Sequence, residues 1–349
     1  MITFAAMKIQ TLHIFNPEHD IALAANLSNF TAPHAGRQLR NDLGFLPALW
    51  ADQEDAVLVD SVDGAERAFK RLRGRLGLEE CLFVDKTKLA KLDIEHIAPW
   101  GWDLALRSTL RRYGVAESLL PTLDEMVQIR LLSHRRTAAR LLPELRVNGT
   151  TGEAFECAIS SELDRLTEKY GQLVVKAPWS SSGRGVSFVL NHDWMRHVVK
   201  QQGSVMVEPF YNKVMDLGME FMATDDGIRY EGLSLFKTKN GAYTGNVLAT
   251  EEVKRSCIGR YLSLDLLDEV RDKIAAKLDL GCYRGPFGVD MMIVRGGLLH
   301  PCVEINLRNT MGHVALILQQ RYNPTGDDDI RGVMRVVYDG SNYKLRIEK

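Results

Sequence analysis

The feature that most constrains how this chain can fold is residues 174–186, a buried strand followed by a loop of serines and glycines. The strand Val174-Val175-Lys176 ends in a lysine, and a second strand is predicted over residues 186–190. Two strands joined by such a loop form a hairpin whose tip can close over a ligand. The glycines allow close backbone approach, and the serines, Lys176 and Arg184 supply donors and positive charge, so the loop suits a polyphosphate. The alternative is an ordinary exposed hairpin tip.

The loop is not a Walker A loop, because it lacks Gly-Lys-Ser/Thr and leads into a strand instead of a helix. A second pair of predicted strands, at residues 287–294 and 298–308, carries acids. Residues two apart in a strand face the same side, so Glu304 and Asn306 point together, and Asp290 can reach them from the partner strand. Two carboxylates and an amide oxygen form a set of hard ligands suited to Mg²⁺. The alternative is a polar strand face in water, with Asn306 opening a turn.

Taken together, these two pairs of strands resemble the ATP-grasp superfamily. The resemblance rests on the lysine strand with its Gly/Ser loop, Asp290 on one strand, and Glu304-Ile305-Asn306-Leu307-Arg308 on the next, and it covers roughly residues 128–320. It implies an α/β chain in which two α+β subdomains sandwich a nucleotide, preceded by a Rossmann-like domain. The expected boundaries are residues 1–120 for the Rossmann-like domain, 121–205 for the subdomain with the Gly/Ser loop, and 206–349 for the subdomain with the metal site and a C-terminal hairpin.

The resemblance also implies where a nucleotide would bind. Lys176 matches the second phosphate lysine of the family, while Arg135 stands nearest to the first, where this chain departs from the family by carrying arginine; Arg136 is the alternative register. Residues 205–210 correspond to the adenine hinge, where we expect Pro209 to break the strand ladder and free backbone groups. The expected nucleotide-binding residues are Arg135, Lys176, Ser181, Ser182, Gly183, Gly185, Val207, Glu208, Phe210 and Asp216.

The activity implied by the resemblance is that of a carboxylate–amine or carboxylate–thiol ligase. ATP would phosphorylate a carboxylate, and an amine or thiol would then attack the acylphosphate. Lys176, Glu304 and Arg308 are the expected catalytic residues, and Asp290, Glu304 and Asn306 the expected ligands of Mg²⁺, with two ions bound and Mn²⁺ as a substitute. The alternatives are a small-molecule kinase on the same scaffold and a nucleotide-binding module without catalysis.

Alternating strands and helices in the first third predict a small parallel sheet. The first strand of this sheet is predicted over residues 11–16. The loop that follows it is crowded with polar side chains and lies at the edge where ligands bind in open α/β sheets. Helix capping is the alternative reading of this loop. A second polar segment, residues 237–246, is either a surface turn or an acceptor-binding loop. The expected substrate residues are Asn16, Glu18, His19, Lys237, Tyr243, Asn246 and Arg308.

Helical periodicity predicts one long helix over residues 124–142, a second over 160–169 and a third over 262–280. Residues 333–338 and 343–347 flank Asp339-Gly340-Ser341-Asn342, which predicts a terminal hairpin.

Composition excludes several classes of protein. The formal net charge of −1 argues against binding to nucleic acid or to anionic membranes. The five cysteines are scattered and odd in number, which favours reduced thiols in a cytoplasmic protein. No apolar run is long enough to span a membrane, and no signal peptide is evident. The resemblance allows a homodimer, and whether translation starts at Met1 or Met7 stays open.

Overall fold

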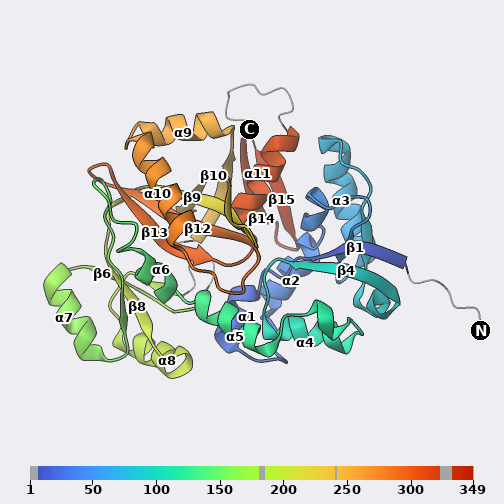
Figure 1. Ribbon diagram of the computed structural model, residues 1–349, viewed down its shortest axis with the longest axis horizontal. Helices are drawn as coiled ribbons and strands as arrows, with labels where there is room; N and C mark the ends of the chain where they lie inside the picture. Colours follow the sequence, from blue (N-terminus) through green and yellow to red (C-terminus); the bar gives the residue numbers. More distant parts are fainter. Residues whose placement is uncertain (1–6, 181–184, 240–241, 323–331, 349) are drawn as a thin grey trace, which may run out of the picture. The chain divides into compact units, whose positions relative to one another are not determined.

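The computed structural model describes residues 7–180, 185–239, 242–322 and 332–348. These residues fall into two compact units (Figure 1). The first comprises those within Met1–Val127, Ile317–Thr325 and Met334–Lys349, and the second those within Gln128–Leu316 and Gly326–Val333. None of the described helices is long and apolar enough to cross a bilayer.

The first unit contains a four-stranded sheet in which every pairing is parallel, as predicted. Its strands are β1 (Met7–Ile14), β2 (Ala56–Leu58), β3 (Leu82–Val84) and β4 (Leu92–Pro99), in the order β3-β2-β1-β4. Parallel pairing requires long crossover connections. The chain between the strands forms α1 (His19–Ala25), α2 (His34–Leu43), η1 (Leu46–Leu49), α3 (Val62–Leu76) and η2 (Lys86–Lys91), and beyond β4 lie α4 (Leu104–Arg112) and η3 (Glu117–Leu119).

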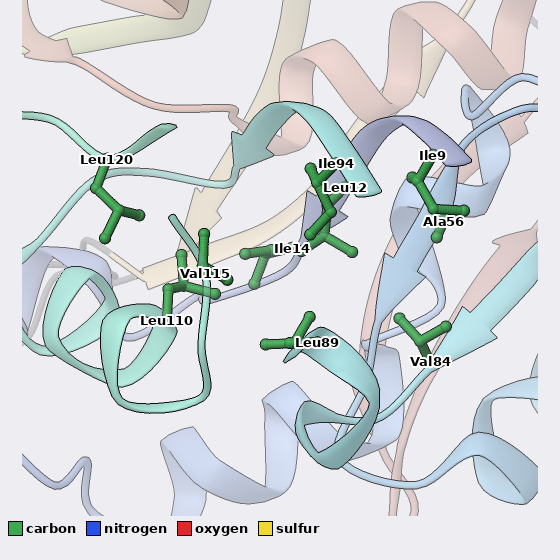
Figure 2. Close-up of a cluster of buried hydrophobic side chains, with 10 residues drawn as sticks. All are labelled: Ile9, Leu12, Ile14, Ala56, Val84, Leu89, Ile94, Leu110, Val115 and Leu120. Atoms are coloured by element: carbon green, nitrogen blue, oxygen red, sulfur yellow. The ribbon is translucent and has the colours of Figure 1, made fainter. Parts of the chain in front are cut away.

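One hydrophobic core of this unit is formed by residues of strands β1 and β2 together with residues of η2 and α4. Leu12 and Ala56 of the sheet belong to the same cluster as Leu89 of η2 and Leu110 of α4, all 0–1% exposed, and Figure 2 shows Leu110 beside Val115. Leu12 and Ile14, two positions apart on β1, both reach this core, which helps to fix the register of this strand.

The smaller sheet of the second unit consists of β5 (Phe155–Cys157), β6 (Leu173–Lys176), β7 (Val186–Ser187) and β8 (Val205–Pro209), in the antiparallel order β5-β8-β6-β7. Helices α7 (Ser160–Tyr170) and α8 (His192–Gln202) pack on it through Leu163 and Met195 (Figure 1). The predicted end of α7 is confirmed, because Gly171 follows it with a φ of 75°.

The larger sheet of the second unit has β9 (Lys213–Thr224), β10 (Gly227–Lys239), β11 (Ala242–Leu248), β12 (Gly285–Val294) and β13 (Leu298–Asn306), in the order β13-β12-β9-β10-β11. Helices α9 (Glu251–Gly259) and α10 (Leu264–Lys277) pack against β10. Residues of β9 alternate: Leu217, Met219 and Phe221 are buried at 0–1% exposure, and Asp216, Gly218 and Glu220 occupy the other face. Helix α11 (Met311–Tyr322) begins five residues after β13, and the predicted terminal hairpin is formed by β14 (Gly332–Tyr338) and β15 (Tyr343–Glu348).

The single helix predicted for residues 124–142 is wrong. Helix α5 (Leu123–Leu132) ends before α6 (Arg136–Leu141) begins. The backbone N–H of Arg135 donates to the Pro178 carbonyl (3.2 Å) instead of continuing a helix, and the Ser133 hydroxyl donates back to Ile129 O (2.7 Å). Such side-chain and tertiary bonds compete with helical ones.

Three boundaries also differ from prediction. Strand β7 stops at Ser187 instead of continuing to residue 190, and α10 covers only part of residues 262–280. Pro209 does not break the ladder: it pairs with Leu173, and the Phe210 N–H donates to Gln172 O (2.8 Å). Proline has no N–H to donate, but the ladder continues because the N–H of the next residue, Phe210, donates the hydrogen bond.

Candidate functional site

One face of the larger sheet gathers the acids predicted for a metal site. Asp290 pairs directly with Glu304 on one side and with Gly218 on the other, while Gly288 pairs with both Asn306 and Glu220. Directly paired residues of a sheet point to the same face. The register therefore aligns Asp290, Glu304 and Asn306 with a further acid, Glu220, that the sequence analysis did not select.

Burial and like charge shape the chemistry of this face. Burial, followed by the nearby Glu304 carboxylate, raises the pKa of Asp290 to about 7. The Asn306 amide donates to Asp290 Oδ2 (3.2 Å), and Arg308 donates to Asn306 Oδ1 (2.9 Å). Two close carboxylates that resist joint ionisation form an arrangement that a cation would stabilise.

The donor set fits a divalent ion that shares its ligands with phosphate. Among the described residues, no three His, Cys, Asp or Glu side chains are arranged to hold a metal by themselves. Asp290, Glu304 and Asn306 would supply part of an oxygen shell, and Mg²⁺ ordinarily completes its shell with water and phosphate oxygens. Reaching them requires the Arg308–Asn306 bond and the ion pair of Glu304 with Arg135 to open.

Arg135 links the two sheets of the second unit. Its guanidinium donates to Ala177 O (2.7 Å), to Ser180 Oγ (2.8 Å) and to the Glu304 carboxylate (2.8 Å). Only 8% of the residue is exposed. Arg136 instead pairs with Glu156. The two registers left open by the sequence are therefore distinct in space, and Arg135 is the arginine beside the base of the Gly/Ser loop.

Lys176 and Glu208 bind one another. They lie on adjacent strands β6 and β8, and Lys176 Nζ is 2.6 Å from both carboxylate oxygens of Glu208. Their residues are 7% and 5% exposed. The charge expected to hold phosphate is thus already neutralised by the acid expected near adenine, and a nucleotide would have to share these two groups.

Gly185 closes the base of the loop. Its carbonyl accepts from the Ala177 N–H (2.7 Å), and a side chain at this position would collide with Ser180. Only glycine fits so close an approach. The other predicted loop residues, Ser181, Ser182 and Gly183, lie outside the described residues.

The remaining predicted nucleotide residues are dispersed. Val207 sits inside the ladder between β5 and β6, and the half-exposed Phe210 ring lies edge-on to Phe188, 6.4 Å between centroids. Asp216 accepts from Lys213 Nζ (2.6 Å) and from the Thr238 hydroxyl (2.7 Å).

The predicted acceptor segment is split between two faces of the sheet. Asn246 pairs with Phe236 and is 1% exposed, donating to Ser234 Oγ (2.7 Å) and accepting from the Tyr243 hydroxyl. Lys237 is exposed and, one residue along, points to the opposite face. The structure brings Tyr243 and Asn246 together and separates Lys237 from them.

Asn16 and Glu18 lie in the first unit, in the loop between β1 and α1, and His19 is the first residue of α1. The Asn16 amide donates to Gly101 O (2.8 Å) and to Asp103 (3.1 Å). Glu18 pairs with Arg40, and burial raises the pKa of its carboxyl above the usual value. Arg40 also lines an open pocket of about 520 Å³ in this unit; the lining residues are His34, Arg37, Gln38, Arg40, Asn41, Asp42, Asp60 and Asn342.

The sequence analysis missed a buried polar cluster formed by Glu220, Thr310 and His313. Thr310 Oγ1 donates to Glu220 Oε2 (2.9 Å), and His313 Nδ1 lies 3.0 Å from the same oxygen. An available signal was the spacing of Asp216, Gly218 and Glu220, which alternates with buried apolar residues along β9.

Comparison with known proteins finds one curated relative and several solved structures of similar fold. No model of a known protein family matches the chain. Over 256 residues it is 25% identical to the [butirosin acyl-carrier protein]–L-glutamate ligase of Niallia circulans. That match covers 68% of this chain and 57% of the relative, so the chain spans less than two thirds of the relative's length.

Two solved structures resemble the chain over nearly its whole length. The first is N5-carboxyaminoimidazole synthetase from Staphylococcus aureus complexed with ADP, with a TM-score of 0.54, 15% identity, and coverage of 98% of this chain and 86% of that one. The second is biotin carboxylase from Campylobacter jejuni, with a TM-score of 0.52, 14% identity, and coverage of 95% and 76%. At such identities the likeness is one of fold.

Proposed function

The chain has the ATP-grasp fold, as its sequence predicts, and on that premise we propose that it is an ATP-dependent ligase that joins a carboxylate to an amine or a thiol. The single observation that carries the proposal is the Arg135 bridge. Arg135 touches the base of the Gly/Ser loop at Ala177 and Ser180 and also Glu304 of the acidic face. A triphosphate cradled by the loop would thereby have its terminal phosphate beside oxygen ligands for a metal ion.

The proposed reaction has two steps. A carboxylate oxygen of the substrate attacks the terminal phosphorus of ATP, ADP leaves, and an acylphosphate forms. The amine nitrogen or thiol sulfur then attacks the acyl carbon, phosphate leaves, and the departing phosphate takes the proton released by the nucleophile. No protein nucleophile takes part, so the chain contributes positioning and electrostatics.

Each named side chain has a proposed task. Arg135 and Lys176 hold phosphate oxygens, and Arg308 stabilises charge on the transferred phosphoryl group. Two Mg²⁺ ions, or Mn²⁺ in their place, held by Asp290, Glu304 and Asn306 would neutralise the phosphates when bound. We propose that residues 121–205, with the Gly/Ser loop, supply one wall of this site and that residues 206–349, with the metal ligands, supply the other.

The substrate classes follow from the curated relative. Its name gives L-glutamate and an acyl-carrier protein as the partners that it joins. We therefore include an amino acid as the carboxylate or amine substrate of this chain, and a small thiol or carrier-bound group as its counterpart. Cys81, Cys157, Cys257 and Cys302 are thiols that form no disulfide, which supports a reducing, cytoplasmic location.

A test uses ADP release from MgATP in a panel of amino acids, alone and with amines or thiols. The proposal expects release that requires both substrates, and expects Glu304→Gln to lower kcat by about 10²- to 10³-fold with the fold intact. Glu231→Gln, at an exposed acid on β10, is the matched control and should retain wild-type activity. Full activity in Glu304→Gln would contradict the proposal, and a stable phosphoester formed without a nucleophile would identify a kinase instead.

A further inference from the structure

Glu220 is a buried acid that the proposed reaction does not use. It lies on β9, on the same face as Asp290, and only 3% of it is exposed. Burying a carboxylate is costly unless its oxygens are bonded. The hydrogen-bond partners of the Glu220 carboxylate therefore indicate its structural role.

Those partners are Thr310, in the turn that leads from β13 into α11, and His313, in the first turn of α11. Thr310 Oγ1 donates to Glu220 Oε2 at 2.9 Å, and the same hydroxyl oxygen accepts from the backbone N–H groups of Gly312 (3.0 Å) and His313 (3.2 Å). Thr310 thus caps the first turn of α11, and Glu220 fixes the orientation of the capping hydroxyl.

The surrounding backbone is shaped to admit this carboxylate. A side chain at Gly312 would collide with Glu220, and a Cβ at Gly288 would lie 2.7 Å from Glu220 Oε2. Gly288 lies on β12 and Gly312 in α11. Two separate elements therefore have glycine where they approach the Glu220 carboxylate. A residue present only to fill space would need no such room.

The hydrogen-bond roles assign a proton to Glu220. His313 Nδ1 accepts from the Thr310 backbone N–H (3.2 Å), and His313 Nε2 faces the Phe221 carbonyl (3.4 Å), so the imidazole proton belongs on Nε2. The 3.0 Å contact between Glu220 and His313 Nδ1 fits a protonated acid that shares this nitrogen with the Thr310 N–H. Burial acts in the same direction, raising the pKa of Glu220 to about 8 and lowering that of His313 to about 4.

The turn held in this way carries Arg308. The Arg308 backbone N–H donates to Asn306 O (2.8 Å), and its guanidinium donates to Asn309 O (3.1 Å) and to Asn306 Oδ1 (2.9 Å). These bonds tie the arginine to the turn itself. The place of the guanidinium therefore depends on what fixes the turn.

We propose that Glu220 is a positioning residue which, through Thr310 and His313, holds the turn between β13 and α11 and so places Arg308 against the reacting phosphoryl group. Its effect on rate rests on the proposed ligase function, whereas its effect on the turn does not. Since misplacing a catalytic group by about 1 Å can cost about 100-fold in rate, the loss of Glu220 should appear in kcat and leave the KM for ATP within about threefold of the wild-type value.

Two pairs of variants test this proposal. Glu220→Gln keeps an oxygen that accepts from the Thr310 hydroxyl, and Thr310→Ser keeps that hydroxyl, so both should retain kcat within about threefold. Glu220→Ala and Thr310→Val remove those groups and should lose about 100-fold in kcat. Hydrogen exchange at the Gly312 and His313 amides, which donate to Thr310 Oγ1, should accelerate only in the second pair. Leu267→Ala, in the buried face of α10, is the control for lost stability alone.

The results that overturn the proposal are distinct from those that overturn the ligase function. Wild-type kcat in Glu220→Ala, or loss of activity in Glu220→Gln equal to that in Glu220→Ala, contradicts it. Should Glu220→Ala fail to fold, the Thr310 pair decides by the same criteria. If the wild-type protein turns over no ATP with any substrate pair, the ligase function is refuted. The positioning of the turn by Glu220 is tested independently, and unchanged amide exchange across the four variants would refute it.

Discussion

An ionised acid is expensive to bury, and Glu220 makes that cost measurable. Its pKa is raised to about 8 in the folded protein, against 4.5 for a free side chain. Between these values the unfolded chain has released a proton that the folded chain keeps, so the contribution of Glu220 to stability falls as pH rises from about 4.5 to about 8. Glutamine has no proton to lose. Glu220→Gln should therefore become more stable relative to wild type by a few kcal/mol between pH 5 and pH 8.

Urea unfolding of both proteins across that pH range checks this prediction. Asp290, whose pKa is also raised, is present in both proteins, and because its charge acts on Glu220 the difference reports this coupled pair. Lys254, His313 and Arg308 face the same group and are likewise common to both. A stability difference that does not change with pH would show that Glu220 is ionised in the folded state.

Among the elements, the β6–β7 connection depends most on one glycine. A side chain at Gly185 would collide with Ser180, whose hydroxyl accepts from Arg135. We expect Gly185→Ala to displace the base of the loop and to weaken ATP binding by at least about tenfold, a loss of about 1.4 kcal/mol. Gly74→Ala, in open space on helix α3, is the matched control and should bind ATP normally while gaining up to about 1 kcal/mol in stability. Isothermal titration with ATP separates the two, and unchanged affinity in Gly185→Ala would refute the role of this loop.

Elements with local signals were predictable from the sequence, and those set by tertiary contacts were not. The end of α7 at Gly171 and the hairpin around residues 339–342 follow from glycine and turn chemistry. The break between α5 and α6 does not, because the bond that produces it joins Arg135 to Pro178, far along the chain. The continuation of the strand ladder through Pro209 was missed for a similar reason, because it depends on a hydrogen bond from the Phe210 N–H to Gln172 O.

At the scale of the whole molecule, the fold class and the alignment of Asp290, Glu304 and Asn306 were both predictable, since strand periodicity governs them. The pairing of Lys176 with Glu208 was not predictable, because it depends on which strands become neighbours in the smaller sheet. The Glu220 cluster was missed because Thr310 and His313 lie about ninety residues away in sequence. Each omission concerns a buried polar group whose partner comes from a distant element.

The candidate site also predicts how ligand binding is distributed over the molecule. Arg135, Lys176, Glu208 and the acids of the larger sheet all belong to the second compact unit. A ligand that binds only the folded state stabilises it by RT ln(1 + [L]/Kd), or about 2.7 kcal/mol at one hundred times Kd. MgATP should therefore slow hydrogen exchange in β6, β8 and β13 and leave the parallel sheet of the first unit unchanged. Exchange measured by mass spectrometry with and without MgATP checks this, with Glu304→Gln in the absence of metal as a control for nucleotide alone. Protection confined to β1–β4 would move the nucleotide to the first unit and remove the basis for the proposed ligase site.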